Sequence, residues 1–228
     1  MCHRTLFTTL FAILVFSVSV GLRAETVCRV IDDDGVSVVG SIVRIVDSGE
    51  DVSCGELDEN GSFSINDGFC KENPAFRIKP KTDDYYQSRK YASEKIVENA
   101  TYTIMIWKKA YIDNLKWNAS HFEEKEDYAK ASLMRNEIYQ RLRGIDDAAA
   151  EEARQKTIRL FARYLNNDTP FATDPLQTQP VINQTFHSAI KQFQQEKGIE
   201  DTGRIDMRTL RTAAGISVGR YLFGRAEE

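Results

Sequence analysis

The chain has 228 residues, of which 42% are hydrophobic, 10% aromatic and 28% charged, with 13 glycines and 5 prolines. These fractions are typical of a folded globular chain and exclude a disordered, collagen-like or multi-span membrane protein. The formal net charge is −4 and no basic cluster occurs, which argues against nucleic acid as a partner. The length allows one or two domains, or three small ones.

The first 24 residues predict a secretory signal peptide. Residues 1–4 are short and basic, residues 6–22 are apolar, and the stretch that ends at Ala24 offers a small residue for cleavage. An uncleaved membrane anchor is the alternative, but the apolar stretch falls short of the roughly 20 residues needed to span a bilayer. We therefore expect an exported chain that begins near Glu25 and has no stable membrane span once the signal is removed.

Export makes the cysteines informative, since disulfides form in oxidising compartments. After signal removal Cys28, Cys54 and Cys70 remain, so two should pair and one should stay free. The sequence leaves all three pairings open; we take Cys54 and Cys70, which would close a short loop, as the candidate disulfide. No C-x-x-C pair occurs, and His121 and His187 lie far from the cysteines, so neither a metal site nor a cofactor is expected.

Residues 25–108 predict an antiparallel β-sandwich. Runs of β-branched and aromatic residues at 36–46, 62–65, 76–78 and 102–106 are separated by turn residues. The pair Asn60-Gly61 stands between two such runs and indicates a hairpin, because both residues tolerate a positive φ.

Three segments of this stretch share an order of turns with a known family. Residues 30–35 form a strand that ends in an Asp/Gly turn, residues 39–43 carry an aliphatic pair, and residues 57–65 read LDENGSFSI, a D-x-x-G-x-F hairpin. This order resembles the carboxypeptidase regulatory-like, transthyretin-like sandwiches. The resemblance implies a non-catalytic accessory domain.

Residues 109–155 predict a helical connector. Apolar residues recur there at helical spacing among Glu, Lys and Arg, without a proline. Gly144 and the pair Asp146-Asp147 indicate a break between two helices, which predicts a helical hairpin. The acidic run at residues 123–127 is interpreted as a solvated face and not as a cation site.

Residues 156–215 contain the most specific pattern, AIKQFQ at 189–194 followed by GIEDTGRIDMRTL at 198–210. Four apolar residues lie on one helical face: Phe186, Ala189, Ile190 and Phe193. Gly198 is placed to end that helix and Asp206 to cap the next one. The pattern resembles the peptidoglycan-binding domain 1 family, a small three-helix module, and residues 158–166 can serve as its first helix.

The resemblance implies that this module binds peptidoglycan or another cell-wall glycan. Saccharide binding uses amide and carboxylate hydrogen bonds, and the candidate ligand-binding residues are Gln194, Asp201, Thr202 and Arg204. Aromatic rings that could stack on sugars are few and lie at its margins: Phe171, Tyr221 and Phe223. This shortage of aromatic rings favours the hypothesis of a purely protein-binding role over the hypothesis of glycan binding. Residues 216–228 are expected to form a tail.

No catalytic residues are predicted. Residues 215–219 match G-x-S-x-G, but a helix is expected before Ser217 and no His follows it, so the setting of a nucleophile elbow is missing.

The first hypothesis is a non-catalytic envelope protein, secreted or periplasmic, that binds peptidoglycan and positions another envelope protein. The alternatives are a periplasmic protein–protein adaptor without glycan binding and a divergent cell-wall hydrolase. The predicted fold is a multidomain α and β protein with an N-terminal antiparallel β-sandwich, a helical connector and a small C-terminal three-helix module.

Overall fold

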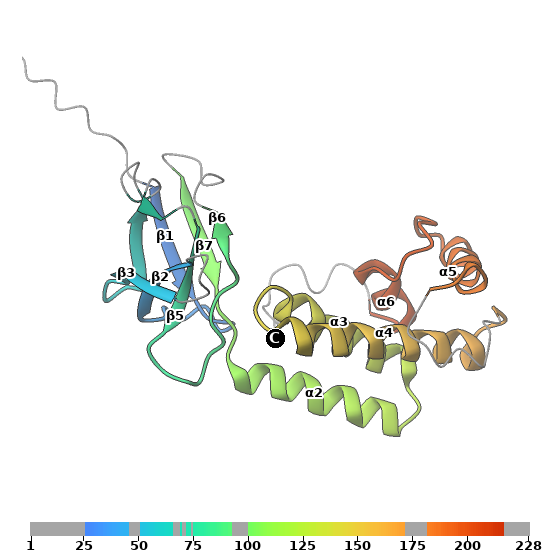
Figure 1. Ribbon diagram of the computed structural model, residues 1–228. Coiled ribbons are helices and arrows are strands. Elements are labelled where there is room, and N and C mark those ends of the chain that lie inside the picture. The colour runs from blue at the N-terminus through green and yellow to red at the C-terminus, as the bar shows by residue number, and fades with distance from the viewer. Residues whose placement is uncertain are drawn as a thin grey trace, which may run out of the picture.

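The computed structural model describes residues 26–45, 51–65, 69, 72–73, 75–92, 100–171 and 182–216. The expected signal peptide, Cys70, Ser217, Tyr221, Phe223 and residues 217–228 of the expected tail lie outside the described residues. Within them, two β-sheets stand at one end of the molecule and five helices at the other, joined where the first of these helices begins (Figure 1). The predicted mixed α and β architecture with a sandwich-like N-terminal part is therefore confirmed at this level.

The sandwich consists of a three-stranded and a four-stranded sheet. The strands are β1 (Thr26–Ile31), β2 (Gly40–Ile45), β3 (Asp51–Glu56), β4 (Ser62–Ile65), β5 (Ala75–Pro80), β6 (Tyr91–Ala92) and β7 (Thr101–Met105). Their order is β4-β1-β7 in one sheet and β3-β2-β5-β6 in the other. Alternate residues of β1 point inward, as the period of a half-buried strand requires. The shared core includes Cys28, Val30, Ile42, Phe63, Phe76, Ile78 and Ile104.

Two expectations about the strands are wrong. The sandwich is not wholly antiparallel, because β1 and β7 pair in parallel. The Asn60-Gly61 turn does not close a hairpin, since β3 and β4 belong to different sheets and β4 pairs with β1 instead. Gly61 has φ +69°, and a Cβ there would lie 2.8 Å from the Val38 carbonyl oxygen and 2.9 Å from that of Val30. The glycine thus lets the turn pass close to the neighbouring backbone as the chain changes sheets.

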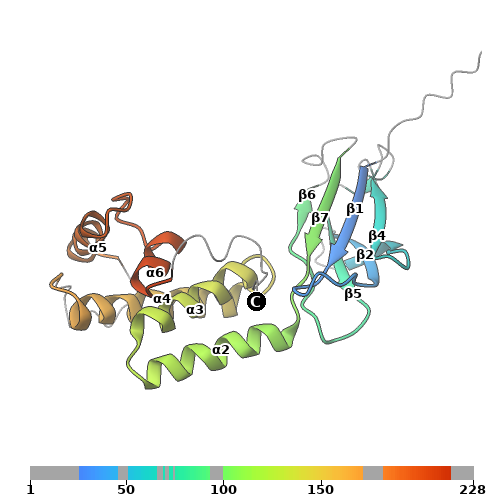
Figure 2. The same ribbon diagram turned by 180° about the vertical axis from the view of Figure 1, so that it is seen from behind.

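The helices are α2 (Lys109–Glu124), α3 (Tyr128–Leu142), α4 (Asp147–Asp168), α5 (Gln184–Glu196) and α6 (Met207–Ala213). α2 lies on the opposite side of α3 and α4 from α5 and α6, as both views show (Figures 1 and 2). In the part of the chain that is described, no helix combines the length and apolarity that a membrane crossing requires.

The helix breaks differ in part from those predicted. The break around Gly144 is confirmed: α3 ends at Leu142, Gly144 has φ +74°, and Asp146 Oδ1 accepts a hydrogen bond from Ala149 N at 3.0 Å as the N-cap of α4. A second break at residues 125–127 was not expected. The acidic run spans this break: residues 124–126 are exposed, as a solvated stretch requires, while Glu126 has φ 58° and Asp127 caps α3 by accepting from Lys130 N at 3.1 Å.

α4 crosses the predicted boundary between connector and module at residues 155 and 156. It runs unbroken because its sequence contains neither glycine nor proline. α3 also contributes to both helical cores, with Leu133 in one and Ile138 in the other. The first core joins Leu133 to the second half of α4, to α5 and to α6 through Phe161, Leu165, Phe186, Ile190, Phe193 and Leu210.

Candidate functional site

The predicted ligand-binding residues gather at the connection between α5 and α6. α5 ends before Gly198, which has φ +64°, and Asp206 begins α6 by accepting a hydrogen bond from Thr209 N at 2.8 Å. The eight residues 198–205 between them form a tight loop, called here the 198–205 loop. Both ends of this loop agree with the roles predicted for Gly198 and Asp206.

Gln194 holds the 198–205 loop from inside. Its Nε2 donates to Thr209 Oγ1 at 2.8 Å, to the Arg204 carbonyl oxygen at 3.1 Å and to Thr202 Oγ1 at 3.2 Å. Its Oε1 accepts from Gly203 N at 2.8 Å. Gln194 is 0% exposed, so it has no surface with which to touch a ligand. The expectation that Gln194 contacts ligand does not fit this burial, and we assign it the role of positioning the loop.

Gly203 allows the loop to lie against α5. It has φ +66°, and a Cβ at this position would lie 2.1 Å from His187 Cε1. His187 is exposed and places its ring beside this glycine. The positive φ favours glycine, and the missing side chain leaves room for the His187 ring, so the glycine at this position of the motif has a structural explanation.

The other predicted residues lie at the surface of the loop. Asp201 and Arg204 are exposed and Thr202 is half-buried. Asp201 Oδ2 accepts from Gln195 Nε2 at 2.8 Å, and this hydrogen bond, with the charge of Lys191, holds the pKa of Asp201 below its ordinary value. The structure thus brings Asp201 and Arg204 to the surface of one short loop, where a carboxylate and a guanidinium can meet a polar ligand.

Sequence reasoning missed an open hollow along α5. It has a volume of about 350 Å³ and is lined by Gln184, Thr185, Ser188, Ala189 and Gln192 of α5. Asn183 begins this helix by accepting a hydrogen bond from Phe186 N at 2.8 Å. The available signal was the i, i+4, i+8 spacing of Gln184, Ser188 and Gln192, which places amide and hydroxyl groups on one helical face.

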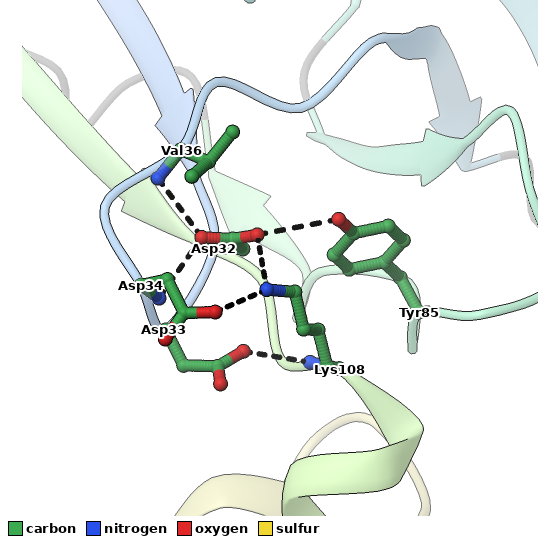
Figure 3. A network of polar contacts seen from close by, with 6 residues as sticks. All are labelled: Asp32, Asp33, Asp34, Val36, Tyr85 and Lys108. Carbon is green, nitrogen blue, oxygen red and sulfur yellow. Dashed lines mark hydrogen bonds and ion pairs between the residues drawn. The ribbon is translucent and has the colours of Figure 1, made fainter.

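A second polar network lies where the sandwich meets α2 (Figure 3). Asp32 is 1% exposed; its Oδ1 accepts from the backbone N of Asp34 and of Val36, each at 2.9 Å. Its Oδ2 accepts from Tyr85 Oη at 3.2 Å and lies 3.0 Å from Lys108 Nζ. Lys108 also pairs with Asp34.

The charges of this network are stabilised in their ionised forms. Burial raises the pKa of Asp32, but hydrogen bonds from Lys108, Val36 and Asp34 outweigh it, and the net pKa is lowered. Hydrogen bonds to Asp34 and Asp32 raise the pKa of Lys108. A lysine held protonated and a carboxylate with both oxygens occupied are poorly suited to exchange protons with a substrate. We interpret the network as a structural joint between the sandwich and the helices.

The described residues near the 198–205 loop provide no well-exposed aromatic ring on which a sugar could stack. Phe171 is half-buried and packs on the helical core. The most exposed ring among the large hydrophobic residues described is Trp117 of α2, at 65%, which stacks on His121 with ring centroids 5.2 Å apart. Trp117 and His121 both lie on α2 and not at the 198–205 loop. Sequence reasoning did not select Trp117.

The cysteines and possible metal ligands add no further site. Cys28 is a buried free thiol whose pKa burial raises to about 11. Cys54 is half-buried, has no disulfide partner among the described residues, and its Sγ lies 3.4 Å from the Ile42 carbonyl oxygen. Because Cys70 is not described, the Cys54–Cys70 disulfide stays a prediction. Among the described residues, no three His, Cys, Asp or Glu side chains are grouped to hold a metal ion.

Comparison with protein-family models, with curated proteins and with solved structures gave no significant match to this chain.

Proposed function

We propose that the chain is a non-catalytic, exported envelope protein that binds peptidoglycan through its C-terminal helices and positions a partner through its N-terminal sandwich. In this proposal the second half of α4, α5 and α6 act as a three-helix binding module that remains packed on α3. The motif at residues 189–210, which resembles the peptidoglycan-binding domain 1 family, supports the assignment.

The observation that carries the proposal is the way Gln194 presents the 198–205 loop. Its four hydrogen bonds order the loop from inside and leave Asp201 and Arg204 at the surface. Groups that are ordered before binding lose less conformational entropy when a ligand arrives. The open hollow along α5 presents further amide and hydroxyl groups, which are suited to the hydroxyl and amide groups of a glycan.

Sedimentation of the purified full chain with isolated cell-wall sacculi tests the proposal. We expect the wild-type chain to sediment with the sacculi and the double variant Asp201→Ala, Arg204→Ala to stay largely in solution. The matched control is Glu151→Ala, Arg154→Ala, which removes an exposed ion pair on α4 with the same change in charge. Absence of wild-type binding, or equal loss in both double variants, would refute the proposal.

A second candidate is a periplasmic protein–protein adaptor without glycan binding. It is favoured by Trp117, whose indole is exposed on α2, the helix on the opposite side of α3 and α4 from α5 and α6. Exposed tryptophans are enriched among the residues that dominate protein interfaces. Crosslinking in envelope extracts of cells that carry the wild-type chain or Trp117→Ala would support this candidate if a specific adduct depends on the indole. The divergent hydrolase has no comparable observation in its favour.

A further inference from the structure

The side of α2 that points away from α3 presents its side chains to solvent along the length of the helix. The inward side of α2 carries Ile112 and Ala119, both 0% exposed. The outward side carries a row at i, i+4, i+7, i+11 and i+14, called here the α2 face: Ala110, Asn114, Trp117, His121 and Glu124. His121 is half-buried and the other four residues are exposed.

Trp117 stands at the centre of the α2 face. Its side chain is 65% exposed, and its ring stacks on the His121 imidazole with centroids 5.2 Å apart and 7° between the ring planes. Because the stacked ring already has a fixed orientation, it loses little side-chain entropy when another surface packs on it. The α2 face therefore has an ordered apolar centre among polar neighbours, which is the arrangement of a protein interface.

The two ends of α2 carry opposite charges in an unfavourable order. Lys109 is the first residue of the helix and Glu124 is the last. The macrodipole makes the N-terminal end of a helix positive and its C-terminal end negative, so each charge lies at the end that disfavours it. Both side chains are exposed, and neither forms an ion pair with another described residue. The opposite charges that would offset this cost are therefore missing from the described part of the chain.

A second copy of α2 in antiparallel orientation supplies these charges. Lys109 lies eight residues before Trp117 and Glu124 lies seven residues after it, which places them about 12 Å and about 10 Å away along the helix axis. When two α2 helices pack antiparallel at Trp117, Lys109 of each copy lies beside Glu124 of the other. The same rotation brings the Asn114 amide of one copy to the His121 imidazole of the other, and these groups can form a hydrogen bond.

We infer that two copies of this chain form an antiparallel dimer through the α2 face, with the two Trp117 rings at the two-fold axis. The face is complementary to itself under this rotation, as an isologous interface requires. One helix of 16 residues from each copy makes a small interface, so we expect a weak dimer with a Kd of about 10–100 µM. The inference goes beyond the proposed function and does not depend on what the other helices bind.

The position of α2 gives the dimer a functional consequence. α2 lies on the opposite side of α3 and α4 from α5 and α6 (Figures 1 and 2). A dimer that forms through the α2 face therefore leaves the 198–205 loop of each copy accessible. Two equal sites in one particle strengthen attachment to a polymer, because the second binding event becomes intramolecular.

Charge reversal tests the antiparallel arrangement itself. Lys109→Glu and Glu124→Lys each place like charges together at both ends of the dimer, and each should weaken self-association about ten-fold. In an equimolar mixture of the two variants the mixed dimer regains both ion pairs, so the mixture should associate about as well as the wild type. Both substitutions suit the macrodipole, so the variants should fold. Sedimentation velocity of the purified full chain between about 1 and about 500 µM measures the association.

Two further variants complete the test. Arg159→Glu reverses an exposed charge on α4, outside the α2 face, and should leave the association unchanged. Trp117→Ala should weaken it about ten-fold, because tryptophans at the centre of an interface contribute much of the binding energy. Circular dichroism should show that all variants fold.

Three outcomes would overturn the inference. The first is a wild-type chain that stays monomeric up to about 500 µM. The second is an equal loss of association in Arg159→Glu, and the third is a mixture of the two charge-reversed variants that associates no better than each variant alone. A different protein captured through Trp117 by a chain that does not self-associate would likewise reject the dimer and assign the α2 face to the adaptor function.

Discussion

The ammonium group of Lys108 lies 3.0 Å from Oδ2 of Asp32, and this ion pair joins the first turn of the sandwich to the residue that precedes α2. The backbone strengthens the connection, since Lys108 N donates to Asp33 Oδ1 at 3.1 Å. Figure 3 shows these groups converging from the turn after β1 and from the start of α2. The sandwich and the helices are therefore linked by a charged joint as well as by the chain.

Replacement of Asp32 should weaken this joint. Asp32→Ala leaves the Asp34 and Val36 amides and the Tyr85 hydroxyl without their acceptor, and we expect a loss of about 1–3 kcal/mol in the free energy of unfolding. Urea denaturation followed by circular dichroism measures it. Asp113→Ala, which removes an exposed partner of Lys116, is the control and should cost under about 0.5 kcal/mol. Similar losses in both variants would contradict the assignment.

The same carboxylate predicts a dependence of stability on pH. The pKa of Asp32 is lowered in the folded chain, so its contribution is complete above the unfolded pKa of about 3.9 and is lost as the pH falls through the folded value. The difference in unfolding free energy between the wild type and Asp32→Asn should therefore narrow as the pH is lowered from about 5 toward and through the folded pKa. A difference that stays constant over this range would show that the charge of Asp32 does not contribute.

Gln194 should be required for the order of the 198–205 loop. Gln194→Met keeps the approximate volume but leaves Gly203 N–H without its acceptor, which should cost about 1–3 kcal/mol. Hydrogen exchange at the Gly203 amide should become faster by a corresponding factor. Gln195→Met changes an exposed neighbour and should leave that exchange rate unaltered. Slow exchange of Gly203 in both variants would refute the role given to Gln194.

The contributions of the Gly203–His187 contact and of the positive φ to the free energy of unfolding can be measured separately. Gly203→Ala should destabilise the chain mainly through the positive φ, by about 1–2 kcal/mol, with a smaller cost because the exposed His187 ring must turn away from the added methyl group. In a His187→Ala background the clash disappears and only the conformational cost remains. Thermodynamic coupling in this double-mutant cycle is the measurement, and strictly additive effects would argue against the contact.

Truncation of Phe193 should strongly destabilise the C-terminal core. It is 0% exposed and meets the rings of Phe161 and Tyr164 edge to face, with centroids 6.0 and 5.8 Å away. Phe193→Ala should cost about 3–5 kcal/mol by denaturant titration. Trp117→Ala truncates a larger ring at an exposed site and should change stability by under about 0.5 kcal/mol. A mild effect at Phe193 would contradict the packing described.

Periodicity and local capping could be predicted from the sequence because they depend on neighbouring residues. Phe186, Ala189, Ile190 and Phe193 recur at helical spacing, and all four are buried on one face of α5. Gly198 and Asp206 end one helix and begin the next, since a positive φ and an N-cap are requirements of a few adjacent residues. Ser62–Ile65 coincides with β4 for the same reason: its alternation is local.

Pairing between distant segments was decided only by the tertiary structure. The alternation within β1 does not reveal that β7 lies parallel to it, because the pairing depends on the path of the whole chain between them. Gln194 likewise stands next to Phe193 in a polar motif. It is buried because the 198–205 loop and the start of α6 fold over it. These segments supply its hydrogen-bond partners, including Thr209, fifteen residues away in the chain. A side chain is interior or exposed according to what the rest of the chain places upon it, and that information is not local.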